Sequence, residues 1–142
     1  MIELAPGFLV SPQIRPTDIA TAKAAGVTLV INNRPDGEDP LQPKGADIAD
    51  AARGAGIAYV AIPIGAAGVS DTDIDAFEAA MSKNKGKTLA FCRTGTRSTV
   101  LRALARARSG VEPDALIEEA AAAGYNIAGL APRLIALSQS AR

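Results

Sequence analysis

The sequence predicts an α/β fold, in which a central, mostly parallel sheet is flanked by helices on both faces. From residue 8 to residue 108, short apolar segments that suit strands alternate with longer segments of helical period. One short segment, residues 27–32, is almost wholly apolar, as expected of a strand that is covered on both faces. The chain of 142 residues shows no repeat and no linker, so residues 1–142 are predicted to form a single domain.

The strands are predicted at residues 8–10, 27–32, 57–62 and 88–91. Each is a short run of apolar residues that is bounded by turn residues. Pro63 closes the third strand, and the turn Asn84-Lys85-Gly86 leads into the fourth.

The helices are predicted at residues 17–25, 46–55, 71–82, 97–108, 113–123 and 131–140. Gly26 ends the first helix, and Gly56 ends the second, which carries Ile48 and Ala52 on one face. Ser70 is a typical N-cap for the third helix. The fourth helix begins soon after the fourth strand, so a short loop joins the two elements.

The composition excludes several classes of function. Fifteen basic and fifteen acidic residues cancel, so the charge gives no reason to expect nucleic acid or an anionic membrane as a partner. The apolar runs are shorter than the roughly 20 residues that span a bilayer, and the first residues lack the features of a signal peptide, so a cytoplasmic location is expected. The chain has no histidine and one cysteine, which excludes the usual zinc-hydrolase and Ser-His-Asp sites and an internal disulfide. No metal and no other cofactor is expected.

Residues 92–98, at the junction of the fourth strand and the fourth helix, combine a cysteine with groups that bind oxyanions. The backbone N–H groups of such a loop point inward, and the helix N-terminus adds partial positive charge. Arg97 can bind two oxygens of a tetrahedral oxyanion. The same field favours a thiolate, so Cys92 is predicted to be a nucleophile, and Ser98 can bond to its sulfur or help to expel it. The further predicted anion-binding residues of the loop are Arg93, Thr94, Gly95 and Thr96.

A second polar segment, residues 33–38, also follows a predicted strand. In open α/β sheets, ligands bind beyond the carboxyl ends of the strands, and both this segment and Cys92 lie at such ends. Arg34 in this segment is predicted to bind a substrate anion or to pair with a carboxylate.

Residues 91–98 resemble the active-site loop of the beta-lactamase-hydrolase-like phosphatase family, which comprises small bacterial relatives of the dual-specificity protein tyrosine phosphatases. Other similar blocks are residues 11–14, 26–32, 33–38 and 62–64, so the resemblance covers about residues 7–110. It implies a dual-specificity-phosphatase-like fold and hydrolysis of phosphate monoesters through a cysteinyl-phosphate intermediate on Cys92. It also implies a phosphorylated protein or small molecule as the substrate.

The loop is shorter than in the main tyrosine phosphatase pattern. Four residues instead of five separate Cys92 from Arg97, and Phe91 stands where a histidine is usual. The pattern Cys-Arg-x-Gly-x-Arg-Ser also resembles a rhodanese loop, in which the cysteine carries a persulfide. Two alternatives therefore remain, a rhodanese-like sulfurtransferase that uses a Cys92 persulfide and a non-catalytic module that binds phosphate or another anion.

The general acid has three candidates. Phosphatases of this mechanism use an aspartate to protonate the leaving oxygen, which contributes roughly 10²–10⁴-fold to the rate. Asp36 is predicted to be this acid, because its loop follows a neighbouring strand and can overhang the cysteine. Glu38 and Asp71 are the alternatives, and Asp71 is the first acidic residue after the third predicted strand.

Overall fold

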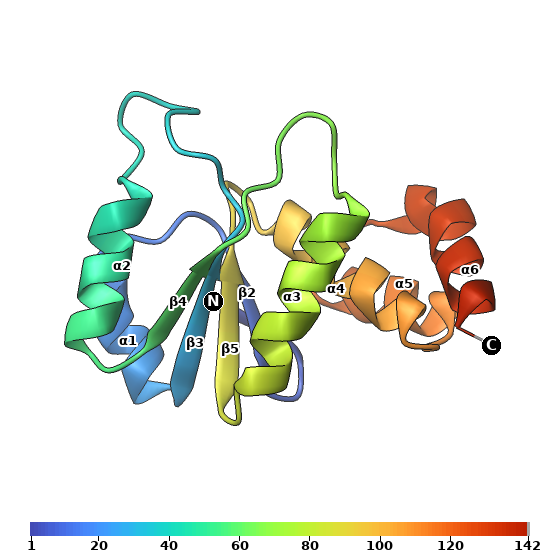
Figure 1. Ribbon diagram of the computed structural model, residues 1–142, viewed down its shortest axis with the longest axis horizontal. Coiled ribbons are helices and arrows are strands. Elements are labelled where there is room, and N and C mark those ends of the chain that lie inside the picture. The colour runs from blue at the N-terminus through green and yellow to red at the C-terminus, as the bar shows by residue number, and fades with distance from the viewer. Residues whose placement is uncertain (142) are drawn as a thin grey trace.

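Residues 1–141, which the computed structural model describes, form a five-stranded sheet with helices on both faces (Figure 1). The strands are β1 (Ile2–Ala5), β2 (Phe8–Ser11), β3 (Val27–Asn32), β4 (Ala58–Ala61) and β5 (Lys87–Phe91). Their order is β1-β2-β5-β3-β4, in which β1 is antiparallel to β2 and the other neighbours are parallel. The predicted α/β class and the mostly parallel sheet are thereby confirmed.

Strand β1 was not predicted from the sequence. It is an edge strand that pairs only with β2, and its first half is exposed. An edge strand of four residues with one exposed half carries little hydrophobic pattern, so its pairing depends on the neighbouring strand.

The helices are α1 (Asp18–Ala24), α2 (Gly45–Gly54), α3 (Asp71–Lys83), α4 (Thr96–Arg108), α5 (Pro113–Ala122) and α6 (Ala131–Ser140), and the short 3₁₀ turn η1 (Ala128–Leu130) precedes α6. Helices α1 and α2 cover one face of the sheet, and α3 and α4 cover the other (Figure 1). Helices α5 and α6 pack on α4. None of the helices in residues 1–141 is both long and apolar enough to cross a membrane.

Alternate residues of the central strands enter two hydrophobic cores, since successive side chains of a strand point to opposite faces. Val30 and Leu89 pack with Ile48 of α2 on one face. Ile31 and Ala90 belong to the larger core beneath α3 and α4 on the other face. The sheet is therefore covered on both faces at its centre, which places polar groups at the ends of the strands.

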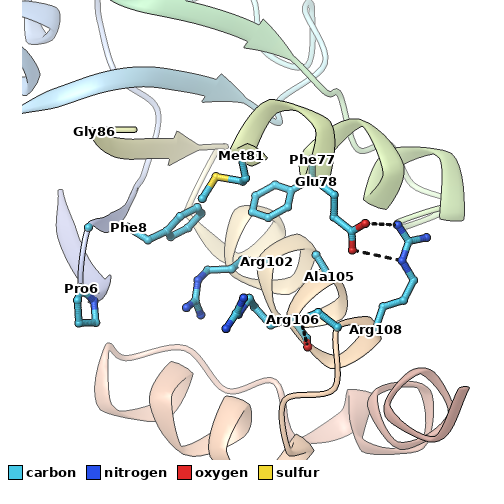
Figure 2. Close-up of a pocket in the computed structure, with 12 residues that line it drawn as sticks. Pro6, Phe8, Phe77, Glu78, Met81, Gly86, Arg102, Ala105, Arg106 and Arg108 are labelled. Atoms are coloured by element: carbon cyan, nitrogen blue, oxygen red, sulfur yellow. Dashed lines mark hydrogen bonds and ion pairs between the residues drawn. The ribbon is translucent and has the colours of Figure 1, made fainter. Parts of the chain in front are cut away.

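A cavity of about 640 Å³ lies at the end of the sheet that is remote from Cys92. Phe8, at the start of β2, lines it together with Phe77 and Met81 of α3 (Figure 2). Arg108, near the end of α4, contributes to its rim and binds Glu78 at 2.8 Å. Because these groups lie at the amino end of the parallel strands, this cavity is not the candidate active site.

Candidate active site

The cysteine loop joins the end of β5 to the start of α4. Cys92 directly follows β5 and is fully buried. Gly95, the N-cap of α4, adopts a φ of 95°, which a glycine tolerates without strain. This left-handed turn directs the Gly95 backbone N–H to Cys92 Sγ, at 3.0 Å.

The electrostatic environment of Cys92 favours the thiolate. Burial of the sulfur acts against ionisation and is the largest single influence. The backbone N–H groups that point to the sulfur together outweigh it, so the pKa of the Cys92 thiol is lowered. These N–H groups belong to Ser98, Thr94, Gly95 and Arg97. The predicted inward-facing N–H groups are thus present around the sulfur.

Arg97 is held by a carboxylate from the loop after β3. Its Nη1 and Nη2 atoms donate to the two carboxylate oxygens of Glu38, each at 2.8 Å. Nη1 also donates to the carbonyl oxygen of Ile64, at 2.8 Å. Arg97 is therefore oriented by three hydrogen bonds, and its guanidinium lies close enough to Cys92 for the thiolate charge to contribute to its raised pKa, after the larger influences of Glu38 and burial.

Glu38 joins Arg97 to Arg34. Arg34 Nε donates to Glu38 Oε1 at 2.9 Å, and Arg34 Nη1 donates to Gln13 Oε1 at 3.1 Å. The hydrogen bond from Arg97 is the main reason that the pKa of Glu38 is lowered to about 2. Of the two roles predicted for Arg34, pairing with a carboxylate is the one for which a contact exists.

A cleft of about 430 Å³ lies over this ion-pair network, and all the residues that line it are charged. It is formed by Arg34, Glu38, Asp39, Arg93 and Arg97. Arg93 is exposed here, and its side chain has no hydrogen bond or ion pair within residues 1–141. Three arginines against two carboxylates make the cleft a suitable entrance for an anion.

Ser98 is buried, and its hydroxyl donates to Asn33 Oδ1 at 2.7 Å. The amide of Asn33 in turn donates to the carbonyl oxygen of Ile62, at 2.9 Å. The Ser98 hydroxyl is thus engaged with Asn33, while its backbone N–H points to Cys92. Asn33 belongs to the segment 33–38 that was predicted to lie at the site, but no role was predicted for its own side chain.

The two aspartates that were predicted as candidates for the general acid, Asp36 and Asp71, interact with groups other than the cysteine loop. Asp36 Oδ1 accepts from the backbone N–H of Gly45 at the start of α2, at 2.9 Å, and no hydrogen bond joins Asp36 to residues 92–98 in the described part of the chain. Asp71 is in the first turn of α3, largely exposed, and 4.0 Å from Arg133. Asp39, which sequence reasoning passed over, shares the charged cleft with Arg97.

Thr94 and Thr96 lie on the outer side of the loop. Their hydroxyl oxygens are 3.1 Å apart, and both residues are exposed. The Thr94 carbonyl oxygen accepts from the hydroxyl of Tyr125, at 3.0 Å. Tyr125 follows α5 and is a further site residue that the sequence did not reveal, because a lone tyrosine between helices carries no signal of a contact 31 residues away.

Within residues 1–141, no group of three or more His, Cys, Asp or Glu side chains is arranged to hold a metal ion. The groups that surround Cys92 are backbone N–H donors and a guanidinium. Such donors bind tetrahedral oxyanions directly.

A central strand that ends in a buried cysteine, followed by an N–H-lined loop and an arginine at the start of a helix, places the protein in the class of dual-specificity and tyrosine phosphatase folds. The kinase-associated phosphatase has this fold, with a TM-score of 0.74 over 94% of this chain and 85% of that one. Its sequence identity of 16% means that the likeness concerns the fold alone.

The chain belongs to the family described as beta-lactamase hydrolase-like protein, phosphatase-like domain, whose family model matches residues 1–109. A crystal structure from Neisseria meningitidis, described as that of a candidate phosphatase, is 31% identical and has a TM-score of 0.84 over 96% of each chain. The beta-lactamase hydrolase-like protein of Xylella fastidiosa is 40% identical over 85 residues, which are 60% of this chain and 20% of that protein. The matched region thus spans about a fifth of the length of this curated relative.

Proposed function

We propose that the protein hydrolyses phosphate monoesters through a cysteinyl-phosphate intermediate on Cys92. The observation that carries this proposal is the set of backbone N–H groups that converge on the Cys92 sulfur beside Arg97. A thiolate in such a loop can attack phosphorus while the N–H groups and the guanidinium bind the phosphoryl oxygens.

Arg97 can serve an oxyanion while it stays bound to Glu38. A guanidinium has five N–H donors. Glu38 takes one N–H from each of Nη1 and Nη2, and the Ile64 carbonyl takes the second N–H of Nη1. The Nε–H and the remaining Nη2–H donate to no oxygen atom within residues 1–141, and the guanidinium also interacts with the Cys92 sulfur. These two N–H groups form the side edge of the guanidinium, which can bind two oxygens of a phosphoryl group.

In the first step, the Cys92 thiolate forms a bond to phosphorus, and the bond between phosphorus and the ester oxygen breaks. The leaving oxygen takes the electron pair and needs a proton when it is a poor leaving group. Glu38, with a pKa of about 2, is ionised near neutral pH and is a poor proton donor. We propose Asp39 as the general acid ahead of Asp36, because Asp39 lines the cleft with Arg97 whereas Asp36 does not. Each carboxylate accepts one backbone N–H, from Leu41 within the same loop for Asp39 and from Gly45 at the start of α2 for Asp36.

In the second step, a water attacks phosphorus and gives a proton to the carboxylate that the first step left ionised, and the bond between sulfur and phosphorus breaks. Cys92 leaves as a thiolate, and inorganic phosphate is released. The N–H groups that lower the pKa of Cys92 stabilise this leaving thiolate, so the same donors serve both steps.

A rhodanese-like sulfur transfer is the second candidate, and one observation favours it. No carboxylate is hydrogen-bonded to the Cys92 sulfur or to the loop N–H groups among residues 1–141. Transfer from thiosulfate needs no such acid, because the thiolate takes the outer sulfur and the leaving group is the stable anion sulfite. Cyanide then takes the outer sulfur of the persulfide to form thiocyanate, which regenerates the thiolate.

The deciding experiment measures phosphate release from an aryl phosphate and thiocyanate formation from thiosulfate plus cyanide with the same preparation. The proposal expects phosphate release that is lost in Cys92→Ser, whereas phosphate binding to that variant persists because backbone groups and Arg97 form the loop. Arg97→Lys is expected to weaken both binding and rate, since an ammonium group cannot donate in two-pronged fashion. If the protein forms thiocyanate but releases no phosphate, the proposal is wrong and the protein is a sulfurtransferase. If it binds phosphate but has neither activity, a binding module is supported.

The acid is tested with Asp39→Asn, Asp36→Asn and Asp71→Asn side by side, on an alkyl phosphate and on an activated aryl phosphate. Loss of a general acid slows the ester with the poorer leaving group much more, by roughly 10²-fold or above. We expect this selectivity in Asp39→Asn. If Asp36→Asn or Asp71→Asn shows it instead, the acid is reassigned and the cysteine mechanism is unaffected.

A further inference from the structure

The peptide unit between Thr94 and Gly95 has a partner on each of its two sides. Its N–H, on Gly95, donates to Cys92 Sγ at 3.0 Å. Its carbonyl oxygen, on Thr94, accepts from the hydroxyl of Tyr125 at 3.0 Å. The peptide is trans, and the N–H and C=O of a trans peptide point in opposite directions. Tyr125 therefore holds the outer side of the peptide whose inner side faces the sulfur.

The Tyr125 hydroxyl lies close to Gly95, and the backbone of Tyr125 is held by α5. A Cβ atom placed on Gly95 would lie 2.2 Å from the Tyr125 hydroxyl oxygen. The backbone N–H of Tyr125 donates to the Ala120 carbonyl of α5 at 2.9 Å, and the nearby Ile127 is buried in the core. The tyrosine thus projects from a fixed turn onto the loop.

We propose that Tyr125 is a positioning residue for the cysteine loop: its hydroxyl holds the Thr94–Gly95 peptide so that the Gly95 N–H points at the reacting sulfur. The need for such a hold follows from Gly95, whose backbone is free to rotate because it lacks a side chain. A hydrogen bond to the carbonyl also polarises the peptide and strengthens its N–H as a donor. Tyr125 lies outside residues 1–109, so the segment beyond the family match contributes to the site.

The proposal deepens the proposed function and rests on it only for the role of Cys92 as the nucleophile. Its test reads the thiol directly, by the pH dependence of alkylation with iodoacetamide, and requires no turnover. Absence of phosphatase activity therefore contradicts the proposed function, whereas it leaves this measurement intact.

The first test compares Tyr125→Phe with the unchanged protein and with Tyr59→Phe as a matched control. Tyr59, the only other tyrosine, accepts a hydrogen bond from Asn32 on β3, so Tyr59→Phe removes an equivalent hydroxyl elsewhere. Without the Tyr125 hydroxyl, we expect the alkylation midpoint to rise by roughly half a pH unit or more, which slows alkylation below the midpoint about threefold. The control should keep the original midpoint. Equal midpoints in all three proteins overturn the proposal.

A second test avoids any loss of the hydroxyl. In the Tyr59→Phe protein, Tyr125 is the sole tyrosine, so biosynthetic incorporation of 3-fluorotyrosine changes only this group. Fluorine beside the hydroxyl makes it a stronger donor, provided that the pH stays low enough for the phenol to remain protonated. The alkylation midpoint should then fall below that of the Tyr59→Phe parent. An unchanged or raised midpoint would contradict the proposal even if Tyr125→Phe failed to fold.

Discussion

The carboxylate of Glu38 holds two arginine side chains of the site in place. It binds Arg97 through two hydrogen bonds and Arg34 through a third. The two guanidinium groups would repel each other, and the negative charge of Glu38 allows them to lie in one cleft. Since Arg97 also serves the proposed oxyanion, Glu38 links the stability of the site to its chemistry.

The lowered pKa of Glu38 predicts a pH-dependent contribution to stability. The carboxylate titrates at about 2 in the folded protein, against a usual value of 4.5. The folded state therefore binds this proton less readily, and the stabilisation is present above pH 4.5 and is lost as the pH falls towards 2. We expect Glu38→Gln to lower the free energy of unfolding by about 1–2 kcal/mol at pH 7.

Urea unfolding between pH 7 and pH 3 checks this expectation. The difference between the unchanged protein and Glu38→Gln should shrink as the pH falls. Glu118→Gln is the control, because Glu118 is exposed and has no ion pair within residues 1–141. A difference that stays constant with pH would mean that the charge of Glu38 is not the cause.

At the scale of elements, the starts of helices decide where polar groups point. Helix α2 has no side-chain cap from its own N-cap residue, Lys44, and receives an acceptor from Asp36 instead. Helix α4 has Gly95 as its N-cap, which has no side chain to cap the helix, and the N–H groups of Arg97 and Ser98 in its first turn point to Cys92. The open start of α4 is what makes it available to a thiolate and an oxyanion.

Helix α3 begins in the opposite way, with a closed start. Ser70 Oγ accepts from the Asp73 N–H at 3.1 Å, and Asp73 Oδ2 accepts from the Ser70 N–H at 2.9 Å. This reciprocal arrangement confirms the predicted Ser70 cap and satisfies two N–H groups.

Loss of this cap should cost stability without affecting the site. Ser70→Ala is expected to lower the free energy of unfolding by about 1 kcal/mol. Thr72→Ala, in the same exposed first turn, removes a hydroxyl that makes no hydrogen bond within residues 1–141 and should change stability much less. Chemical denaturation of both variants measures the difference, and equal losses would remove the cap as the explanation.

At the scale of the whole molecule, residues beyond the family match form part of the same core. The family match ends at residue 109, whereas α6 packs on α4 and Leu134 is fully buried there. Leu116 of α5 joins the same core. Since α4 carries the cysteine loop at its start, the packing of α5 and α6 supports the element on which the site is built.

Leu134→Ala should therefore destabilise the whole fold, by about 2–5 kcal/mol, as expected for removal of a buried leucine side chain. Ile135→Ala is the matched control, because the neighbouring Ile135 is 45% exposed and should cost much less. Thermal unfolding followed by far-UV circular dichroism compares them. A separate, early transition confined to part of the helical signal would show that α5 and α6 unfold independently of the sheet.

The sequence by itself determined the class of fold, most element positions and the cysteine loop. These features depend on local patterns: apolar runs for β3 and β5, a cap at Ser70, and the close spacing of Cys92, Gly95 and Arg97. Groups that act within seven consecutive residues need no long-range information to be recognised. The resemblance to the family likewise rested on short blocks.

Only the tertiary structure decided which distant groups meet that loop. Glu38 comes to Arg97 across 59 residues, and Tyr125 comes to Thr94 across 31. The direction of the Asp36 carboxylate, towards α2, depends equally on how its loop folds back on the helix. Such contacts follow from how β3, β5 and the C-terminal helices pack, and residue types alone do not encode that packing, because a carboxylate or a hydroxyl suits any nearby donor or acceptor.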